Sequence, residues 1–160
     1  MLDFLRVKTV PTVSWSSPRP LNFFPALRTF VLLCVGLVLF GVGEALLINA
    51  GVGVSPWTVF SQGVANTSGL GIGMSTFFIG VGVLVLWIPL RQTPGLGTLL
   101  NIIIIAAVME LSLPYLPQMA GTVSGIIQTM LGVFIVGLGS GLYLVANLGP
   151  GPRDGVMTGL

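Results

Sequence analysis

The sequence predicts an all-α protein, a polytopic bundle of transmembrane helices that includes re-entrant or half helices. Three observations lead to this prediction. Only 6% of the 160 residues are charged and 54% are hydrophobic, whereas a soluble domain carries about 25% charged residues. Several apolar runs are about 20 residues long, enough to cross a hydrocarbon core of about 30 Å. A glycine-rich segment in the first half of the chain also recurs, in one register, near its end.

Residues 1–28 differ from the rest of the chain. They contain four basic residues and four prolines, and prolines interrupt helices. We expect a basic, Pro-rich and flexible leader. A cleaved signal peptide is the competing interpretation, but the apolar run that follows is longer than a signal core and has no clean cleavage site after it.

The first two elements expected after the leader are a membrane span and a short helix. Residues 29–50 form an apolar run whose single charged residue is Glu44, and we place the first transmembrane helix there. The next segment mixes aromatic residues, polar residues and glycines, which makes it too polar for a lipid-facing span. Because Ser55 is a good N-cap and Pro56 suits a first helical position, we expect a short helix over about 55–66.

Three more spans and a second short helix complete the expected order. Apolar runs occupy 74–90, 96–113 and 122–148, and turns rich in proline or glycine separate them. Pro152 again suits a first helical position, so the start of another short helix is expected over 152–160. The chain is therefore expected to combine long apolar helices with two short helices that begin inside the membrane.

Part of the chain is duplicated. Residues 32–64 share eight identities with the segment 96 positions later, without a gap, and five of these are glycines. The matches cover a helix, a turn and the start of the next helix. We therefore expect a first membrane repeat over 29–121 and the start of a second over 122–160. The second repeat would lack counterparts of residues 74–113, so the chain is expected to be a truncated piece of a longer protein.

The basic residues predict how the repeats are oriented. If residues 55–73 enter the membrane and return on the same side, all six basic residues lie with the N-terminus on the cytoplasmic side, as the positive-inside bias favours. If this segment crosses instead, Arg91 and Arg153 lie outside. The first arrangement gives each repeat an odd number of crossings, so successive repeats are inverted, as in many transporters. We expect a multi-pass protein with a cytoplasmic N-terminus.

The same reasoning predicts an intramembrane site. Irregular backbone at membrane depth must be buried in protein or line a wet cavity, so the two short-helix starts are candidate walls whose N–H groups would bind an anionic group. Tight packing turns are the alternative. Glu44 carries a costly charge inside a span and is either a substrate or proton site or a structural carboxylate that is neutral or paired, with Arg153 as the candidate partner. The candidate site residues are Glu44, Asn49, Ser55, Trp57, Arg153 and Asp154.

Composition also argues against several classes of function. The chain has no histidine and a single cysteine, so we expect no metal site, no cofactor, no catalytic residues and no enzymatic activity. A net charge of +2 is too small to indicate nucleic-acid binding. The expected partners are the lipid bilayer, a small solute, and either a second copy of the chain or another membrane protein.

Three segments carry recognisable motifs: GEALLINAGVGVSPW at 43–57, LWIPLRQTPGLGT at 86–98 and GPGPRDGVMTG at 149–159. They resemble the YczE branch of the YczE/YyaS/YitT bacterial membrane proteins. The resemblance covers about 28–160 and implies a polytopic protein of the bacterial inner (plasma) membrane, without a substrate or reaction. The leading hypothesis is a transporter-like permease for a small solute. The alternative is a non-transporting accessory or scaffold protein that supports a partner complex.

Overall fold

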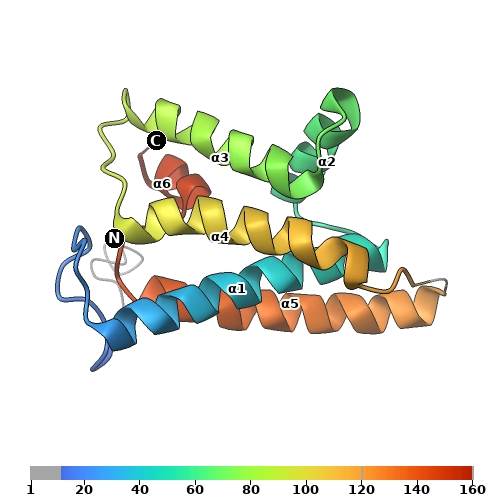
Figure 1. Cartoon of the computed structure of the whole chain (residues 1–160), viewed down its shortest axis with the longest axis horizontal. Coiled ribbons are helices and arrows are strands. Elements are labelled where there is room, and N and C mark those ends of the chain that lie inside the picture. The colour runs from blue at the N-terminus through green and yellow to red at the C-terminus, as the bar shows by residue number, and fades with distance from the viewer. Residues whose placement is uncertain (1–11, 120, 160) are drawn as a thin grey trace, which may run out of the picture.

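The computed structural model describes residues 12–119 and 121–159, and all regular structure in these ranges is helical (Figure 1). Three stretches are long and apolar enough to cross a membrane: Leu27–Ala50, Leu96–Tyr115 and Thr122–Val145. The helices in chain order are α1 (Leu27–Ala50), α2 (Pro56–Ser68), α3 (Ile72–Trp87), α4 (Leu96–Ser112), the 3-10 turn η2 (Leu113–Tyr115), α5 (Thr122–Val145) and α6 (Pro152–Gly159).

The long helices run back and forth between two ends of the molecule (Figure 1). Helices α1 and α4 run in one direction, and α3 and α5 run in the other. We call the end that holds the start of α1 the N-terminal end, and the opposite end the distal end. Helix α1 packs against both α5 and α4, and α3 packs against α4. Helices α2 and α3 meet at a bend of 111° and together make a fourth candidate span.

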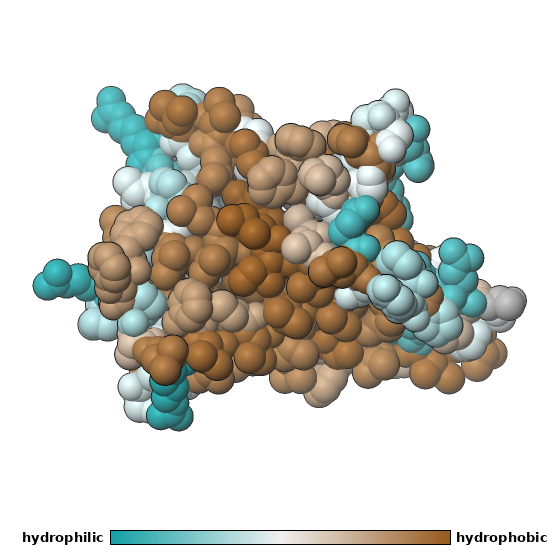
Figure 2. All heavy atoms as spheres, in the orientation of Figure 1, coloured by the Kyte–Doolittle hydropathy of each residue, from teal (hydrophilic) through white to brown (hydrophobic). Residues whose placement is uncertain are grey.

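The surface between the two ends is apolar. Figure 2 shows hydrophobic residues across the middle of one face, with hydrophilic residues gathered toward both ends. Large apolar side chains are exposed on each long helix, among them Val38 of α1, Val81 of α3, Ile103 of α4 and Phe134 of α5. A patch of this extent marks an interaction surface and not a water-facing one. Together with the long apolar helices, it makes the chain a membrane protein.

Helices α1 and α5 approach closely because glycines face each other at two levels. A Cβ atom added to Gly36 would lie 2.9 Å from the carbonyl oxygen of Gly139, and one added to Gly139 would lie 2.6 Å from that of Gly36. Gly43 and Gly132 make the same kind of contact, with corresponding distances of 3.0 and 3.1 Å. Small residues allow membrane helices to pack backbone against backbone in this way. The α1–α5 pair therefore packs backbone against backbone at two levels.

After α1 the chain turns back into the bundle before α2 begins. Ser55 caps α2 by accepting a hydrogen bond from the backbone N–H of Thr58 (3.2 Å). The hydroxyl of Thr58 donates to Glu44, which lies six residues before α1 ends. The first turn of α2 is therefore inside the bundle, while its other end leads into α3 at the distal end (Figure 1).

Helix α6 has a similar place near the N-terminal end. After α5 the chain turns back and α6 lies between α3 and α4 (Figure 1). Two side chains hold this turn by donating to its carbonyl oxygens: the Thr98 hydroxyl to Pro150 (2.7 Å) and the Trp87 indole N–H to Pro152 (3.0 Å). Both short helices thus begin within the bundle.

Two helices end a few residues earlier than the apolar runs from which they were predicted. Helix α3 covers Ile72–Trp87, where a span over 74–90 was expected, and α5 ends at Val145 and not at residue 148. The apolar residues beyond α5 are buried in the turn that leads to α6. The carbonyl of Leu148 there accepts a hydrogen bond from the N–H of Gly97 (2.7 Å). After α5, hydropathy indicates burial and does not distinguish a helix from a buried turn.

The described part of the leader is irregular but attached to the bundle. Residues 12–26 contain no helix. The Ser16 hydroxyl donates to the carbonyl of Val145 (2.6 Å), and the Ser17 N–H donates to that of Ala146 (3.0 Å). These bonds satisfy carbonyl groups that the end of α5 leaves without helical partners. This part of the expected flexible leader is therefore tied down, and the first eleven residues lie outside the described chain.

Candidate functional site

A cavity of about 50 Å³, lined by both apolar and polar side chains, lies within the bundle, and each α-helix contributes to its wall. This volume suits an ion or a few water molecules, because sites for drug-sized ligands measure about 300–1,000 Å³. Its polar lining residues are Glu44, Thr58, Ser61, Thr76, Asn101, Tyr143, Arg153 and Asp154. The cavity therefore concentrates hydroxyl, amide and charged groups within an otherwise apolar bundle.

One wall of the cavity joins α1 to the start of α2. Glu44 is only 5% exposed, and one of its carboxylate oxygens accepts a hydrogen bond from the Thr58 hydroxyl (2.8 Å). That hydroxyl also lies 2.8 Å from the Ser55 hydroxyl. The carboxylate thus sits beside the N-terminal end of α2, where the helix dipole favours negative charge. Trp57, in the same turn of α2, also lines the cavity.

The opposite wall joins α5 to the start of α6. The Tyr143 hydroxyl donates to the carboxylate of Asp154 (2.5 Å), which lies in the first turn of α6. The Arg153 Nε atom is 3.8 Å from the other oxygen of Asp154, and its guanidinium lies 5.3 Å from the centre of the Phe40 ring. An Arg over an aromatic face is a favourable cation–π arrangement. This wall therefore contains both partners of an ion pair.

The two walls are built alike. In each, a long helix bonds to the third residue of the short helix that follows it, Glu44 to Thr58 and Tyr143 to Asp154. The charge pairing differs, because Arg153 pairs with Asp154, and no basic side chain of residues 12–119 or 121–159 lies within 4 Å of the Glu44 carboxylate. The structural pairing of Glu44 with Arg153 considered from the sequence is therefore not observed.

The structure brings most of the sequence-predicted site residues together. Glu44, Trp57, Arg153 and Asp154 line the cavity, and Ser55 contacts its wall through Thr58. Asn49 is placed elsewhere. Its side-chain amide donates to the carbonyls of Leu113 (3.1 Å) and Leu116 (2.9 Å), so it holds the turn after α4 at the distal end.

Sequence reasoning misses Tyr143 as a site residue. The available signal is a tyrosine inside a long apolar helix, because a buried phenol needs a hydrogen-bond partner. Its partner becomes visible only in the fold, since α6 must turn back for Asp154 to reach it. Asn101 and Ser61 are also brought to the cavity by packing. Within the described residues, no three His, Cys, Asp or Glu side chains gather as metal ligands would.

Glu110 is a carboxylate outside the cavity with a different task. One of its oxygens accepts hydrogen bonds from the backbone N–H groups of Gly73 (2.8 Å) and Met74 (3.3 Å). These donors lie in the first turn of α3, where helical N–H groups have no helical acceptor. Glu110 of α4 therefore caps α3 from a neighbouring helix.

Comparison with known proteins identifies the family. A model described as "Family of unknown function (DUF6198)" matches residues 27–160. The chain belongs to this family. An uncharacterized protein of Haemophilus influenzae is 37% identical over 155 residues, which cover 97% of this chain and 70% of the relative. The uncharacterized membrane protein YczE of Bacillus subtilis is 35% identical over 126 residues, which cover 76% of this chain and 58% of YczE.

These matches confirm the resemblance drawn from the three sequence motifs, and the protein is of the YczE type. The chain spans 70% of the length of the first relative and 58% of the second. No solved structure matches it. The names of these relatives state no substrate, so the function must be inferred from the site itself.

Proposed function

We propose that this chain forms a transporter-like permease for a small solute and that the solute binds in this cavity. The observation that carries the proposal is the meeting of two helix starts, with their charged side chains, at one cavity inside a membrane bundle. In many secondary transporters, discontinuous helices end at the substrate site near the membrane midplane. We propose a non-enzymatic role, in which the hydrogen-bonded pair of Thr58 and Glu44 joins α1 to the start of α2.

The proposal includes a re-entrant α2. Helix α1 ends and α3 begins at the distal end (Figure 1), while the first turn of α2 reaches Glu44 inside the bundle. Helix α2 has 13 residues, a length of about 20 Å, which is short for a crossing. A chain that enters from the distal end and returns to it explains both the bend of 111° and the position of α3.

The proposal also includes an inverted repeat, and the α1–α5 contact supports it. The offset of 96 residues relates Gly36 to Gly132 and Gly43 to Gly139. The contact of Gly36 with Gly139 is then the counterpart of the contact of Gly132 with Gly43, and both occur. Such reciprocal contacts are typical of an interface with two-fold symmetry. The same relation links two further pairs: Gly43–Val136 with Gly139–Phe40, and Gly132–Leu47 with Gly36–Tyr143.

Because α1 and α5 are antiparallel (Figure 1), a two-fold axis between them would lie in the membrane plane, as inverted repeats require.

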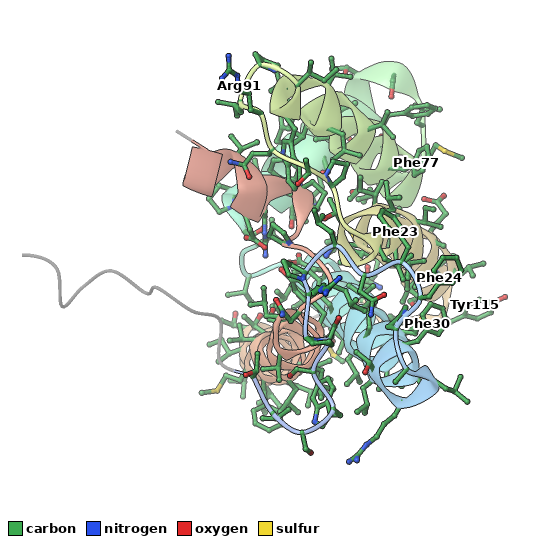
Figure 3. All side chains as sticks on the ribbon, turned by 90° about the vertical axis from the view of Figure 1, so that its left-hand side faces the viewer. Phe23, Phe24, Phe30, Phe77, Arg91 and Tyr115 are labelled. Atoms are coloured by element: carbon green, nitrogen blue, oxygen red, sulfur yellow. The ribbon has the colours of Figure 1, made fainter. Side chains whose placement is uncertain are left out.

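We further propose that the N-terminal end faces the cytoplasm of a bacterium. Arg19 precedes α1, Arg28 lies in the first turn of α1 and Arg91 follows α3, so these cations share that end, as the positive-inside bias favours. Figure 3, viewed from this end, shows Arg91 projecting away from the bundle.

The test uses the full-length protein reconstituted in proteoliposomes. Uptake is measured for labelled alkali cations, small amines, amino acids and small carboxylates, in the wild type and in two variants. We expect uptake of one class that is lost in Glu44→Gln and retained in Glu110→Gln, because Glu110 lies outside the cavity. Correctly inserted protein that takes up none of these solutes would contradict the permease proposal.

A non-transporting scaffold is the second candidate function, and one observation favours it. No atom lies within 4 Å of a Cβ added to Gly137 or Gly141 of α5, so this Gly-xxx-Gly pair is open in the described chain. Such pairs pack membrane helices together. A stoichiometric partner that co-purifies with the wild type and is lost in Gly137→Leu, together with the absence of solute uptake, would favour the scaffold.

A further inference from the structure

We propose that the cavity selects a small monovalent cation and that the Glu44 carboxylate binds it. This inference rests on the proposed permease function and names its class of solute. The two helix starts by themselves predict an anionic group. The surrounding side chains argue for the opposite charge, in three steps.

First, the helix starts offer few free donors to an anion. Pro56 and Pro152 occupy the first helical positions and have no N–H group. The N–H of Thr58 is already bonded to the N-cap of α2. Carboxylates also lie at both starts, Glu44 beside α2 and Asp154 within the first turn of α6. An anionic solute would therefore bring a third negative charge to positions that two carboxylates already occupy.

Second, the charges of the cavity wall leave one carboxylate without a counter-charge. The lining contains two carboxylates and one guanidinium, and Arg153 lies beside Asp154 and over Phe40. The Glu44 carboxylate accepts its hydrogen bond from the neutral hydroxyl of Thr58. A buried charge without a counter-charge is costly, and more so at membrane depth. A cation in the cavity would supply the missing charge.

Third, the available ligands suit a hard cation. The wall beside Glu44 offers the carboxylate and the hydroxyl oxygen of Thr58, and the hydroxyl of Ser61 and the amide of Asn101 lie on the same cavity. Oxygen ligands of this kind suit hard cations, and a single carboxylate without a counter-charge calls for a single positive charge. The volume of about 50 Å³ admits one such ion with few waters. A proton on Glu44 satisfies the same charge requirement, and the experiment separates the two cations.

The experiment measures the melting temperature of the purified full-length protein in detergent. Lithium, sodium or potassium chloride is compared with N-methyl-D-glucamine chloride at constant ionic strength. We expect one alkali cation to raise the melting temperature by about 5 °C at saturation, because a ligand that binds only the folded state stabilises it. Glu44→Gln should lose this shift, and the matched variant Glu110→Gln should keep it.

A second arm tests the proton. Stability is followed from neutral to acidic pH in N-methyl-D-glucamine chloride, for the wild type, Glu44→Gln and Asp154→Asn. Asp154 is included because it is the other carboxylate on the cavity, together with Tyr143 and Arg153. Acid stabilisation that Glu44→Gln abolishes and Asp154→Asn retains would identify the cation as a proton. If the folded wild type responds to neither cation, or if it is stabilised by sodium phosphate or acetate over sodium chloride independently of Glu44, the inference is wrong.

These outcomes also separate the inference from the proposed function. Glu44-dependent cation binding without uptake in proteoliposomes would support the cation site and contradict the permease. Uptake of a neutral or anionic solute with no dependence on alkali cations or on pH would support the permease and contradict the cation site.

Discussion

One phenol connects three helices at the candidate site. Tyr143 of α5 is 3% exposed and donates a hydrogen bond to Asp154 of α6 (2.5 Å). Its ring also packs edge-on against Phe40 of α1, with ring centres 6.4 Å apart. The hydroxyl therefore positions the first turn of α6, and the ring fixes that turn relative to the α1–α5 pair.

We predict that Tyr143→Phe lowers the free energy of unfolding by about 1.5–3 kcal/mol, the usual worth of a hydrogen bond to a charged group. Tyr115 provides the control, because it is 88% exposed, and Tyr115→Phe should change stability by less than about 0.5 kcal/mol. Reversible unfolding in mixed micelles measures both. Equal effects of the two substitutions would show that the bond to Asp154 does not hold the helix.

A second prediction concerns the cap that Glu110 provides. Glu110→Ala removes the acceptor for the N–H groups of Gly73 and Met74, and we expect a loss of about 1–3 kcal/mol. Glu110→Gln keeps one side-chain oxygen and should recover a large part of this loss. Hydrogen exchange at the two amides is the local readout. Unchanged exchange in Glu110→Ala would contradict the capping role.

At the residue level, the sequence predicts those contacts that form between residues close together in the chain. Ser55 and Pro56 predict the start of α2 because capping depends on residues a few positions apart. The bond of Tyr143 to Asp154 and that of Glu110 to Gly73 join residues 11 and 37 positions apart on different helices. No local pattern contains these pairs. Asn49 is polar and near a predicted turn, yet only the fold shows that it bonds to the turn after α4.

At the level of helices, the α1–α5 contact depends on glycine. We predict that Gly139→Ala destabilises the protein by about 1–3 kcal/mol, because the new methyl group would meet the backbone of α1 and force the helices apart. Gly141→Ala is the matched control in the same helix, since space around it is open in the described chain. The control should be neutral or stabilising by up to about 1 kcal/mol, as helix propensity favours Ala. Unfolding measurements that rank the two variants in the opposite order would contradict the packing.

Helix positions follow from apolar runs, but helix ends do not. A run of apolar residues is needed both by a span and by a buried turn, so the expected span to residue 148 extends past the end of α5 at Val145. The 111° bend between α2 and α3 lies near glycines that the sequence shows. Its angle depends on how α2 packs into the bundle, which no local pattern specifies.

For the whole molecule, composition is enough to predict a helical membrane protein, because so few charges cannot cover a water-facing surface. The place of α2 is harder to predict. Its prediction depends on where a few basic residues lie in the sequence. Arg91 matters most, because the positive-inside bias uses it to assign the side of the membrane on which α3 ends. The cavity could be anticipated only as a meeting of two helix starts, and its charge balance required the positions of Arg153 and Glu44.

The central claim is that α2 returns to the side from which it entered, so that the two related units are inverted. Accessibility labelling tests it with single cysteines at Asn66, Thr93 and Gln118 in the full-length Cys34→Ala protein. In intact cells we predict that a membrane-impermeant maleimide labels the cysteines at Asn66 and Gln118, and labels the one at Thr93 only after the membrane is permeabilised. Labelling at Thr93 from outside, with Asn66 protected, would contradict the claim.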